Sequence, residues 1–197
     1  MSEFIDRKDH PKMVEFYELI ESTEITPDNW NKVEEILKSF IREDPDFYDP
    51  YTTIFEINRA KKLEEKATDI LKTGYERAVN YVLKESQGEW PDKLKWSWME
   101  NRHIIRVILN WGTRAWELGG WSDAEQALQK LVLSDPEDRP GVRYYLLAVK
   151  MNMSYQDFMS RFDKGGYYDA EAEAWFRKHA IEYPGDFKQV LALIENE

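Results

Sequence analysis

The chain has 197 residues, 42% of them hydrophobic and 14% aromatic, which is enough to bury one substantial core and excludes a disordered tail. It contains no cysteine, so disulfides, thiolate catalysis and cysteine-based zinc sites are excluded. A net charge of -11 disfavours general binding to nucleic acids and to anionic membranes. The sequence shows no signal peptide and no apolar run of about 18 residues, and we therefore expect a soluble, cytoplasmic protein.

Helix-start signals and the spacing of apolar residues predict an all-α fold of about ten helices without strands. In the first half of the chain the expected helices begin at His10, Thr26, Asp49, about Glu65 and about Lys93. The first of these would bury Val14 and Tyr17, and the last would run as far as Leu118. In the second half the expected helices begin at Ser122, Arg139, Ser154, Asp169 and Pro184, with Gly165-Gly166 as the clearest loop.

The ends of the predicted helices contain an internal repeat. Trp30, Val33, Leu37, Phe40 and Pro45 have the same spacing as Trp121, Ala124, Leu128, Leu131 and Pro136. Weaker copies end at Pro91 and Pro184, so the prolines that end the copies recur at intervals of about 46 residues. The alternative is that any amphipathic helix ending in Asp-Pro produces a similar pattern by itself.

The stretch from Gly112 to Pro136 resembles the second half of a tetratricopeptide repeat. Gly112 and Ala124 occupy the small positions at which two helices approach closely, Leu128 the large position, and Pro136 the stop. The first helix departs from the pattern of that family. The repeat interval is also longer than the usual length of about 34 residues.

This resemblance implies an α-solenoid of helix-turn-helix pairs, a TPR-like right-handed superhelix, as a single domain over residues 1–197. It divides the chain into an N-terminal capping helix over 1–25, about four helical pairs over 26–184 and a C-terminal capping helix over 185–197. The function that it implies is non-catalytic binding of a protein or peptide in the concave groove.

A strip of polar and basic residues is the candidate peptide-binding site. By the resemblance it lies on the first helix of successive helical pairs. It consists of Arg102, Arg106, Asn110, Thr113, Arg143 and Lys150. Basic residues in such a strip would hold acidic side chains or a peptide carboxylate, similar to the carboxylate clamp of some tetratricopeptide proteins. Solvated arginines that pair with neighbouring glutamates are the alternative interpretation. We expect a monomer or weak homodimer.

Two further stretches have both a structural and a functional interpretation. Trp90, Trp96 and Trp98 are either an aromatic anchor for a partner or core residues that seal a gap between helices. In the run Asp135–Tyr144, either Asp135 or Asp138 is expected to cap the following helix, and Arg143 to reach back to a carboxylate or to helix-end carbonyls.

No residue set predicts catalysis, a metal or a cofactor. His10, His103 and His179 are the only histidines, their spacing matches no metal-binding motif, and we expect each to be a lone structural or surface residue. A serine nucleophile motif and a phosphate-binding loop are also absent from the sequence. Two alternatives stay open. One is an all-helical enzyme or small-ligand binder with a pocket in the groove, and the other is a self-assembling structural subunit.

Overall fold

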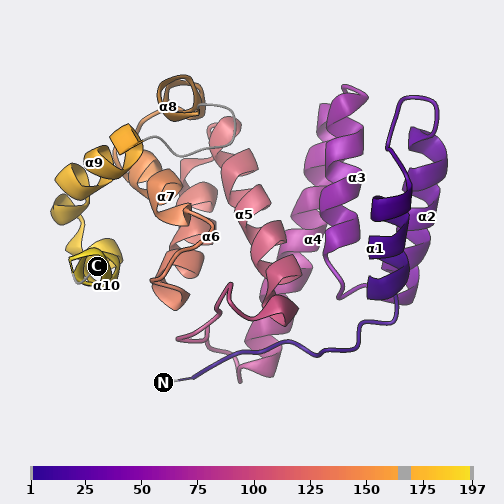
Figure 1. The fold of residues 1–197 in the computed structure, drawn as a ribbon, viewed down its shortest axis with the longest axis horizontal. Helices are drawn as coiled ribbons and strands as arrows, with labels where there is room; N and C mark the ends of the chain where they lie inside the picture. The colour runs from indigo at the N-terminus through magenta and orange to yellow at the C-terminus, as the bar shows by residue number, and fades with distance from the viewer. Residues whose placement is uncertain (1, 164–169, 196–197) are drawn as a thin grey trace. The chain divides into compact units, whose positions relative to one another are not determined.

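The computed structural model describes residues 2–163 and 170–195, and these residues form ten α-helices and two short 3-10 helices (Figure 1). No β-strand is found in the described ranges, where strand-like pairing is limited to isolated bridges such as that between Glu3 and Lys93. The all-α prediction is therefore confirmed. The expected loop at Gly165-Gly166 and the helix start at Asp169 lie outside the described residues.

Backbone contacts divide the chain into two compact units. The N-terminal unit consists of Phe4–Glu89 and Trp98–Asn110. The C-terminal unit consists of Met1–Glu3, Trp90–Ser97 and Trp111–Glu197. The single domain over residues 1–197 and its division into capping helices and pairs stay predictions.

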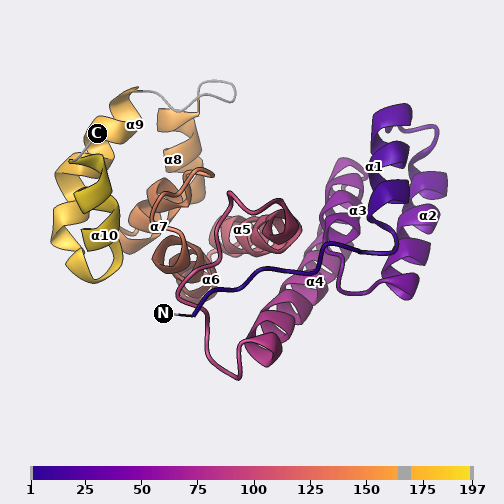
Figure 2. The ribbon, with the colours of Figure 1, turned by 60° about the horizontal axis from the view of Figure 1, so that its bottom comes forward.

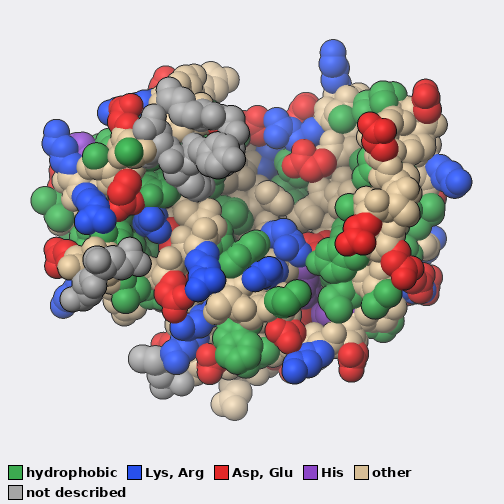
Figure 3. Space-filling model, in the orientation of Figure 1, with side chains coloured by type: hydrophobic (Ala, Val, Ile, Leu, Met, Phe, Trp, Pro, Cys, Tyr) green, Lys and Arg blue, Asp and Glu red, His purple; other side chains and the backbone are tan. Residues whose placement is uncertain are grey.

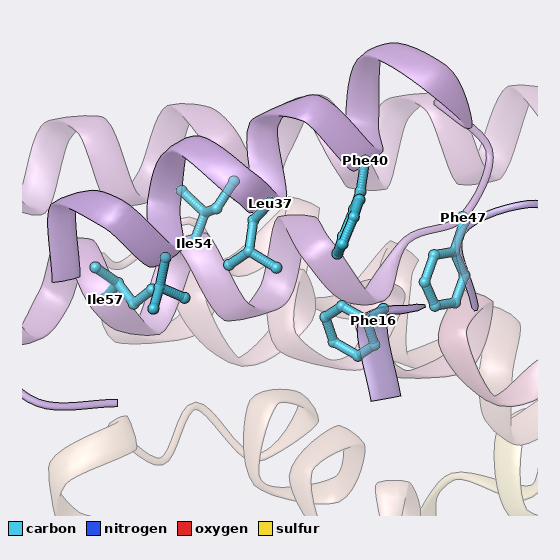
Figure 4. Packing of buried hydrophobic residues seen from close by; sticks show 7 residues of the cluster. Phe16, Leu37, Phe40, Phe47, Ile54 and Ile57 are labelled. Carbon is cyan, nitrogen blue, oxygen red and sulfur yellow. The ribbon is translucent and has the colours of Figure 1, made fainter. Parts of the chain in front are cut away.

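The N-terminal unit contains four complete helices and the first part of a fifth. They are α1 (Met13–Ser22), α2 (Trp30–Glu43), α3 (Asp49–Ala60), α4 (Glu64–Glu85) and α5 (Arg102–Glu117) up to Asn110, with the 3-10 helix Met99–Asn101 before α5. Helices α1, α2 and α3 lie side by side in both ribbon views (Figures 1 and 2). Their shared core includes the buried side chains of Phe16, Val33, Leu37, Phe40, Phe47, Ile54 and Ile57 (Figure 4).

Helix α4 packs on α3 through a glycine. A Cβ atom at Gly74 would lie only 2.9 Å from Cβ of Tyr51 and 3.1 Å from Cγ2 of Val107. Only glycine therefore permits this separation of the helices.

The C-terminal unit contains the end of α5 from Trp111 and five further helices. They are α6 (Trp121–Ser134), α7 (Val142–Lys150), α8 (Tyr155–Phe162), α9 (Ala170–His179) and α10 (Pro184–Ile194), with the 3-10 helix Ala180–Glu182 before α10. The expected close contact at Gly112 is present, because a Cβ atom there would lie 2.9 Å from Cδ2 of Leu128. Ala124 is fully buried, as its predicted position requires.

Two features of the predicted helices are wrong. Helix α5 begins at Arg102 rather than near Lys93, because the preceding backbone donors are bound by distant residues. Lys93 donates to the carbonyl of Ser2, Leu94 to that of Ser134 and Trp96 to the carboxylate of Asp135.

In α1 the buried residue is Phe16, whereas the side of the helix predicted to be buried is exposed, with Val14 64% accessible.

The repeated positions have matching environments in the two units. Helices α2 and α6 each have 14 residues, and their repeated apolar positions, from Val33 to Phe40 and from Ala124 to Leu131, are buried. The helices end at Asp44 and Asp135 with nearly the same backbone angles, φ -138° and ψ 79° against φ -142° and ψ 78°. The Asp-Pro stops therefore have a common local structure.

Candidate functional site

A buried cluster of two histidines and two aspartates lies in the N-terminal unit. Oδ2 of Asp6 is 2.8 Å from Nε2 of His10 and 2.7 Å from Nε2 of His103. Nδ1 of His10 is 2.9 Å from Oδ2 of Asp44. The side chains of all four residues are at most 4% exposed. The sequence led us to expect lone histidines. His10 and His103 instead both contact one carboxylate oxygen, Oδ2 of Asp6.

The proton positions in this cluster follow from its donors and acceptors. The backbone N–H of Tyr48 donates to Nδ1 of His103 at 3.1 Å, so this nitrogen must offer a lone pair. His103 is therefore neutral, with its proton on Nε2. His10 has a carboxylate oxygen at each ring nitrogen, and both nitrogens satisfy these acceptors only when both carry a proton. The imidazolium form of His10 thus satisfies both carboxylates, whereas Arg7, whose Nη2 is 3.2 Å from Nδ1, can donate to that nitrogen only when it is unprotonated.

The pKa values agree with this assignment. Burial lowers the pKa of His103 more than its bond to Asp6 raises it. Burial also acts to lower the pKa of His10, but its hydrogen bonds to Asp6 and Asp44 outweigh this effect and raise the pKa. Burial acts to raise the pKa of Asp6, whereas hydrogen bonds from His10, His103 and the hydroxyl of Tyr81 hold it well below the ordinary value.

Asp6, His10 and His103 are also residue types that bind metals, with one potential ligand atom from each within 4.8 Å of the others. A metal on Nε2 of His103 would require the proton on Nδ1, where the N–H of Tyr48 already donates. The contacts of 2.7 and 2.8 Å around Oδ2 of Asp6 are moreover those of hydrogen bonds. This arrangement fits a proton network and does not fit a metal centre.

The two histidines of the cluster line a hollow with a volume of about 540 Å³. Its charged lining has four cationic side chains, Arg7, Lys8, Arg102 and Arg106, and one acidic side chain, Glu100. Two of these cations are ion-paired, Arg7 with Asp44 and Arg106 with Asp49. The other lining residues are His10, Met13, Tyr17, Phe47, Met99 and His103. In Figure 3 a histidine surface (purple) lies between hydrophobic (green) and basic (blue) side chains.

Arg106 is fixed in the wall of this hollow by an ion pair. Its Nε donates to Oδ1 of Asp49 at 2.8 Å, and Nη2 donates to the hydroxyl of Tyr17 at 3.0 Å. The same hydroxyl donates to Oδ2 of Asp49. Arg106 is thus held in place by its partners, whereas Lys8 is exposed and has no ion-pair partner among residues 2–163 and 170–195.

The two units divide the predicted peptide-binding residues between them. Arg102, Arg106 and Asn110 belong to the N-terminal unit, and Thr113, Arg143 and Lys150 to the C-terminal unit. The structure brings Arg102 and Arg106 together in the lining of one hollow.

The two basic residues of the predicted site that lie in the C-terminal unit have acidic neighbours. Arg143 contacts Asp138 at 3.4 Å and Glu173 at 3.3 Å, and Lys150 contacts Glu125 at 2.6 Å. Asp138 caps α7 by accepting from the backbone N–H groups of Val142 and Arg143, one of the capping roles expected from the sequence.

The three tryptophans of the candidate anchor differ in exposure. Trp90 and Trp96 are half-buried in the C-terminal unit, and Lys130 lies over the ring of Trp90. Trp98 is exposed and belongs to the N-terminal unit. Sequence reasoning missed Asp6, Arg7, Lys8 and Asp44 as site residues, since they lie in segments without helical periodicity and their partners are distant in sequence.

Comparisons of the chain with protein-family models, curated proteins and solved structures find no match. Within the described part of the chain, no helix has both the length and the apolar character needed to cross a lipid bilayer.

Proposed function

We propose that this protein is a non-catalytic scaffold that binds an acidic segment of a protein or peptide in the basic hollow of the N-terminal unit. The observation that carries the proposal is the lining of the hollow, with four cationic side chains against one acidic one. In a chain with a net charge of -11, such a concentration of positive charge is a local exception that favours anionic ligands.

The uncharged lining indicates what else the ligand carries. Met13 and Met99 contribute apolar surface to the lining of the hollow, and Met99 is 73% exposed. Thioether side chains adapt to differently shaped apolar partners. A peptide with an apolar side chain flanked by carboxylates would contact both kinds of lining, with Arg102 and Arg106 as charged contacts.

We also propose that α2 and α6 occupy equivalent positions in TPR-like repeats. This equivalence is supported by the matching lengths of α2 and α6, their matching buried positions and their common Asp-Pro ends. The glycine contacts at Gly74 and Gly112 agree with the close helix packing that such repeats require.

The binding proposal can be tested by fluorescence anisotropy. The probe is a labelled ten-residue peptide that alternates glutamate with leucine and phenylalanine. We expect the double variant Lys8→Glu, Arg102→Glu to bind it about tenfold more weakly or worse, because two attractive charges become repulsive. Arg102 begins α5, where a glutamate is favourable, so the fold should tolerate the change.

The matched controls are a peptide with glutamine in place of glutamate and the variant Lys84→Glu. Lys84 is in the same unit, is 81% exposed and does not line the hollow. Equal binding of both peptides, or an equal effect of Lys84→Glu, would refute the proposal. If citrate rather than the peptide bound, with the same sensitivity to the double variant, the ligand would be a small anion, for which the volume of about 540 Å³ is suitable.

A further inference from the structure

The N-terminal segment, defined as Phe4–Pro11, forms one wall of the basic hollow. Arg7, Lys8 and His10 of this segment line the hollow. The segment is not helical, so helical hydrogen bonds do not fix its position. At its start, Phe4 is buried and its carbonyl accepts from Asn101. Further along, the side chains of Asp6 and His10 bind residues of α5 and of the loop after α2, and Arg7 binds Asp44 in the same loop. The hollow is therefore complete only while these contacts persist.

These contacts depend on the charge of His10. Asp6 and Asp44 are its two anionic neighbours, and Arg7, 3.2 Å from Nδ1 of His10, is the cationic one. His103 of α5 packs against the ring of His10 and is neutral. With His10 protonated, two positive charges therefore balance two negative charges.

Other titratable groups act on the cluster from the remaining helices. Tyr81 of α4 donates to Oδ1 of Asp6, and Asp49 of α3 acts electrostatically on His103. Tyr81 stays protonated through the neutral and moderately alkaline range, since burial and its bond to Asp6 raise its pKa. Asp49 is bound by Arg106. Neither group changes charge when His10 does.

Loss of the His10 proton leaves one uncompensated negative charge in a buried site. The lone pair on Nδ1 then faces the Asp44 carboxylate oxygen, which is 2.9 Å away, closer than the guanidinium of Arg7. Exposure of the N-terminal segment to water relieves both penalties.

We propose that the N-terminal segment is a proton-dependent wall of the basic hollow. Protonated His10 keeps it closed, and loss of that proton opens it. The consequence for ligand binding rests on the proposed function, whereas opening of the segment does not. An acidic ligand would bind while His10 is protonated and be released as the pH rises through the folded pKa of His10.

One substitution separates this mechanism from a general alkaline effect. In the Asp44→Asn variant the new amide can donate to Nδ1 of neutral His10, while its oxygen still accepts from Arg7. The segment then has a closed state that needs no proton on His10. We expect this variant to stay closed at pH values at which the wild-type segment opens.

The experiment uses a nitroxide label at Asp9→Cys, an exposed position in the segment and a unique thiol, since the native chain has no cysteine. Electron paramagnetic resonance reports the mobility of the label from pH 6 to pH 9.5, and a second label at Lys84→Cys is the control. Affinity for the acidic peptide is measured by anisotropy in parallel. When about nine tenths of the molecules are open, the apparent affinity falls about tenfold.

The proposal is supported if label mobility rises with pH in the wild-type background, with the same midpoint as the NMR titration of His10, and stays low in Asp44→Asn. It is overturned if mobility is constant, if the two midpoints differ, or if a folded Asp44→Asn protein opens like the wild type. Opening of the segment without peptide binding at any pH would support this inference and refute the proposed function. If Asp44→Asn does not fold, the comparison of midpoints decides.

Discussion

The hydrogen bond from the backbone of Tyr48 to Nδ1 of His103 distinguishes two histidines that contact the same carboxylate oxygen. It makes His103 a donor at Nε2 only, whereas His10 must donate from both ring nitrogens. A single backbone donor thus decides the charge of one residue, and the positions of two carboxylates decide that of the other.

Nitrogen-15 NMR of the three histidines tests this assignment. At pH 7 we expect both ring nitrogens of His10 to show imidazolium shifts, and His103 to show one protonated and one unprotonated nitrogen with the proton on Nε2. His10→Gln and His103→Gln variants assign the signals. A neutral His10 at pH 7 would contradict the charge balance that we infer for the cluster.

Sequence reasoning identified some of these residues and missed others for a physical reason. Arg102 and Arg106 were recognisable because helical spacing places them on one side of a helix. Asp6 and His103 are 97 residues apart, and Asp6 lies in a segment without periodicity. No local sequence pattern indicates a contact between residues so far apart. The cluster therefore becomes apparent only when the chain is folded.

At the scale of helices, the ends were more predictable than the contacts. Asp-Pro ends α2 and α6 near the expected residues, because proline cannot continue a helix. The expected helix from Lys93 failed because its backbone donors bind Ser2, Ser134 and Asp135. A propensity for helix is overridden when distant segments supply hydrogen-bond partners.

The contact between α3 and α4 gives a prediction for Gly74→Ala. Alanine is a better helix former than glycine by about 1 kcal/mol, but its Cβ would lie 2.9 Å from Cβ of Tyr51, which the backbone holds in place. We expect a net loss of about 1–2 kcal/mol in the free energy of unfolding, since overpacking outweighs propensity. Urea unfolding of the purified variant measures it.

Gly185→Ala is the matched control for this helix contact. Gly185 lies in the first turn of α10, and a Cβ atom there would have no neighbour within 4 Å. This change should leave stability unaltered or slightly increased. A Gly74→Ala variant as stable as Gly185→Ala would mean that α3 and α4 can separate without cost.

For the whole molecule, the cluster predicts how stability depends on pH. The pKa of His10 is higher in the folded protein than in the unfolded one. The contribution of His10 to the free energy of unfolding is therefore fully present below its unfolded pKa of about 6.5, and it is lost as the pH rises through its folded pKa. The folded pKa of Asp6 is depressed, so its contribution is present above about pH 4 and is lost as the pH falls further.

The alkaline part of this dependence can be isolated by comparing two proteins. Above about pH 6.5 we expect the unfolding free energy of the wild type to fall more steeply with pH than that of Asp44→Asn, because Asp44 helps to raise the folded pKa of His10. The difference cancels groups common to both proteins, including Tyr17, whose pKa burial raises to about 12. Urea titrations at several pH values provide the curves, and parallel curves would exclude a contribution from the contact between His10 and Asp44.

Helix α5 belongs to both units, with residues up to Asn110 in one and residues from Trp111 in the other. Residues 1–3 likewise belong to the unit that contains the end of the chain. Neither unit is a continuous stretch of sequence, and no single cut of the polypeptide releases one of them intact. A cut between Asn110 and Trp111 would divide α5, and exchange of a unit between proteins would require new chain connections. Truncation alone therefore cannot yield either unit.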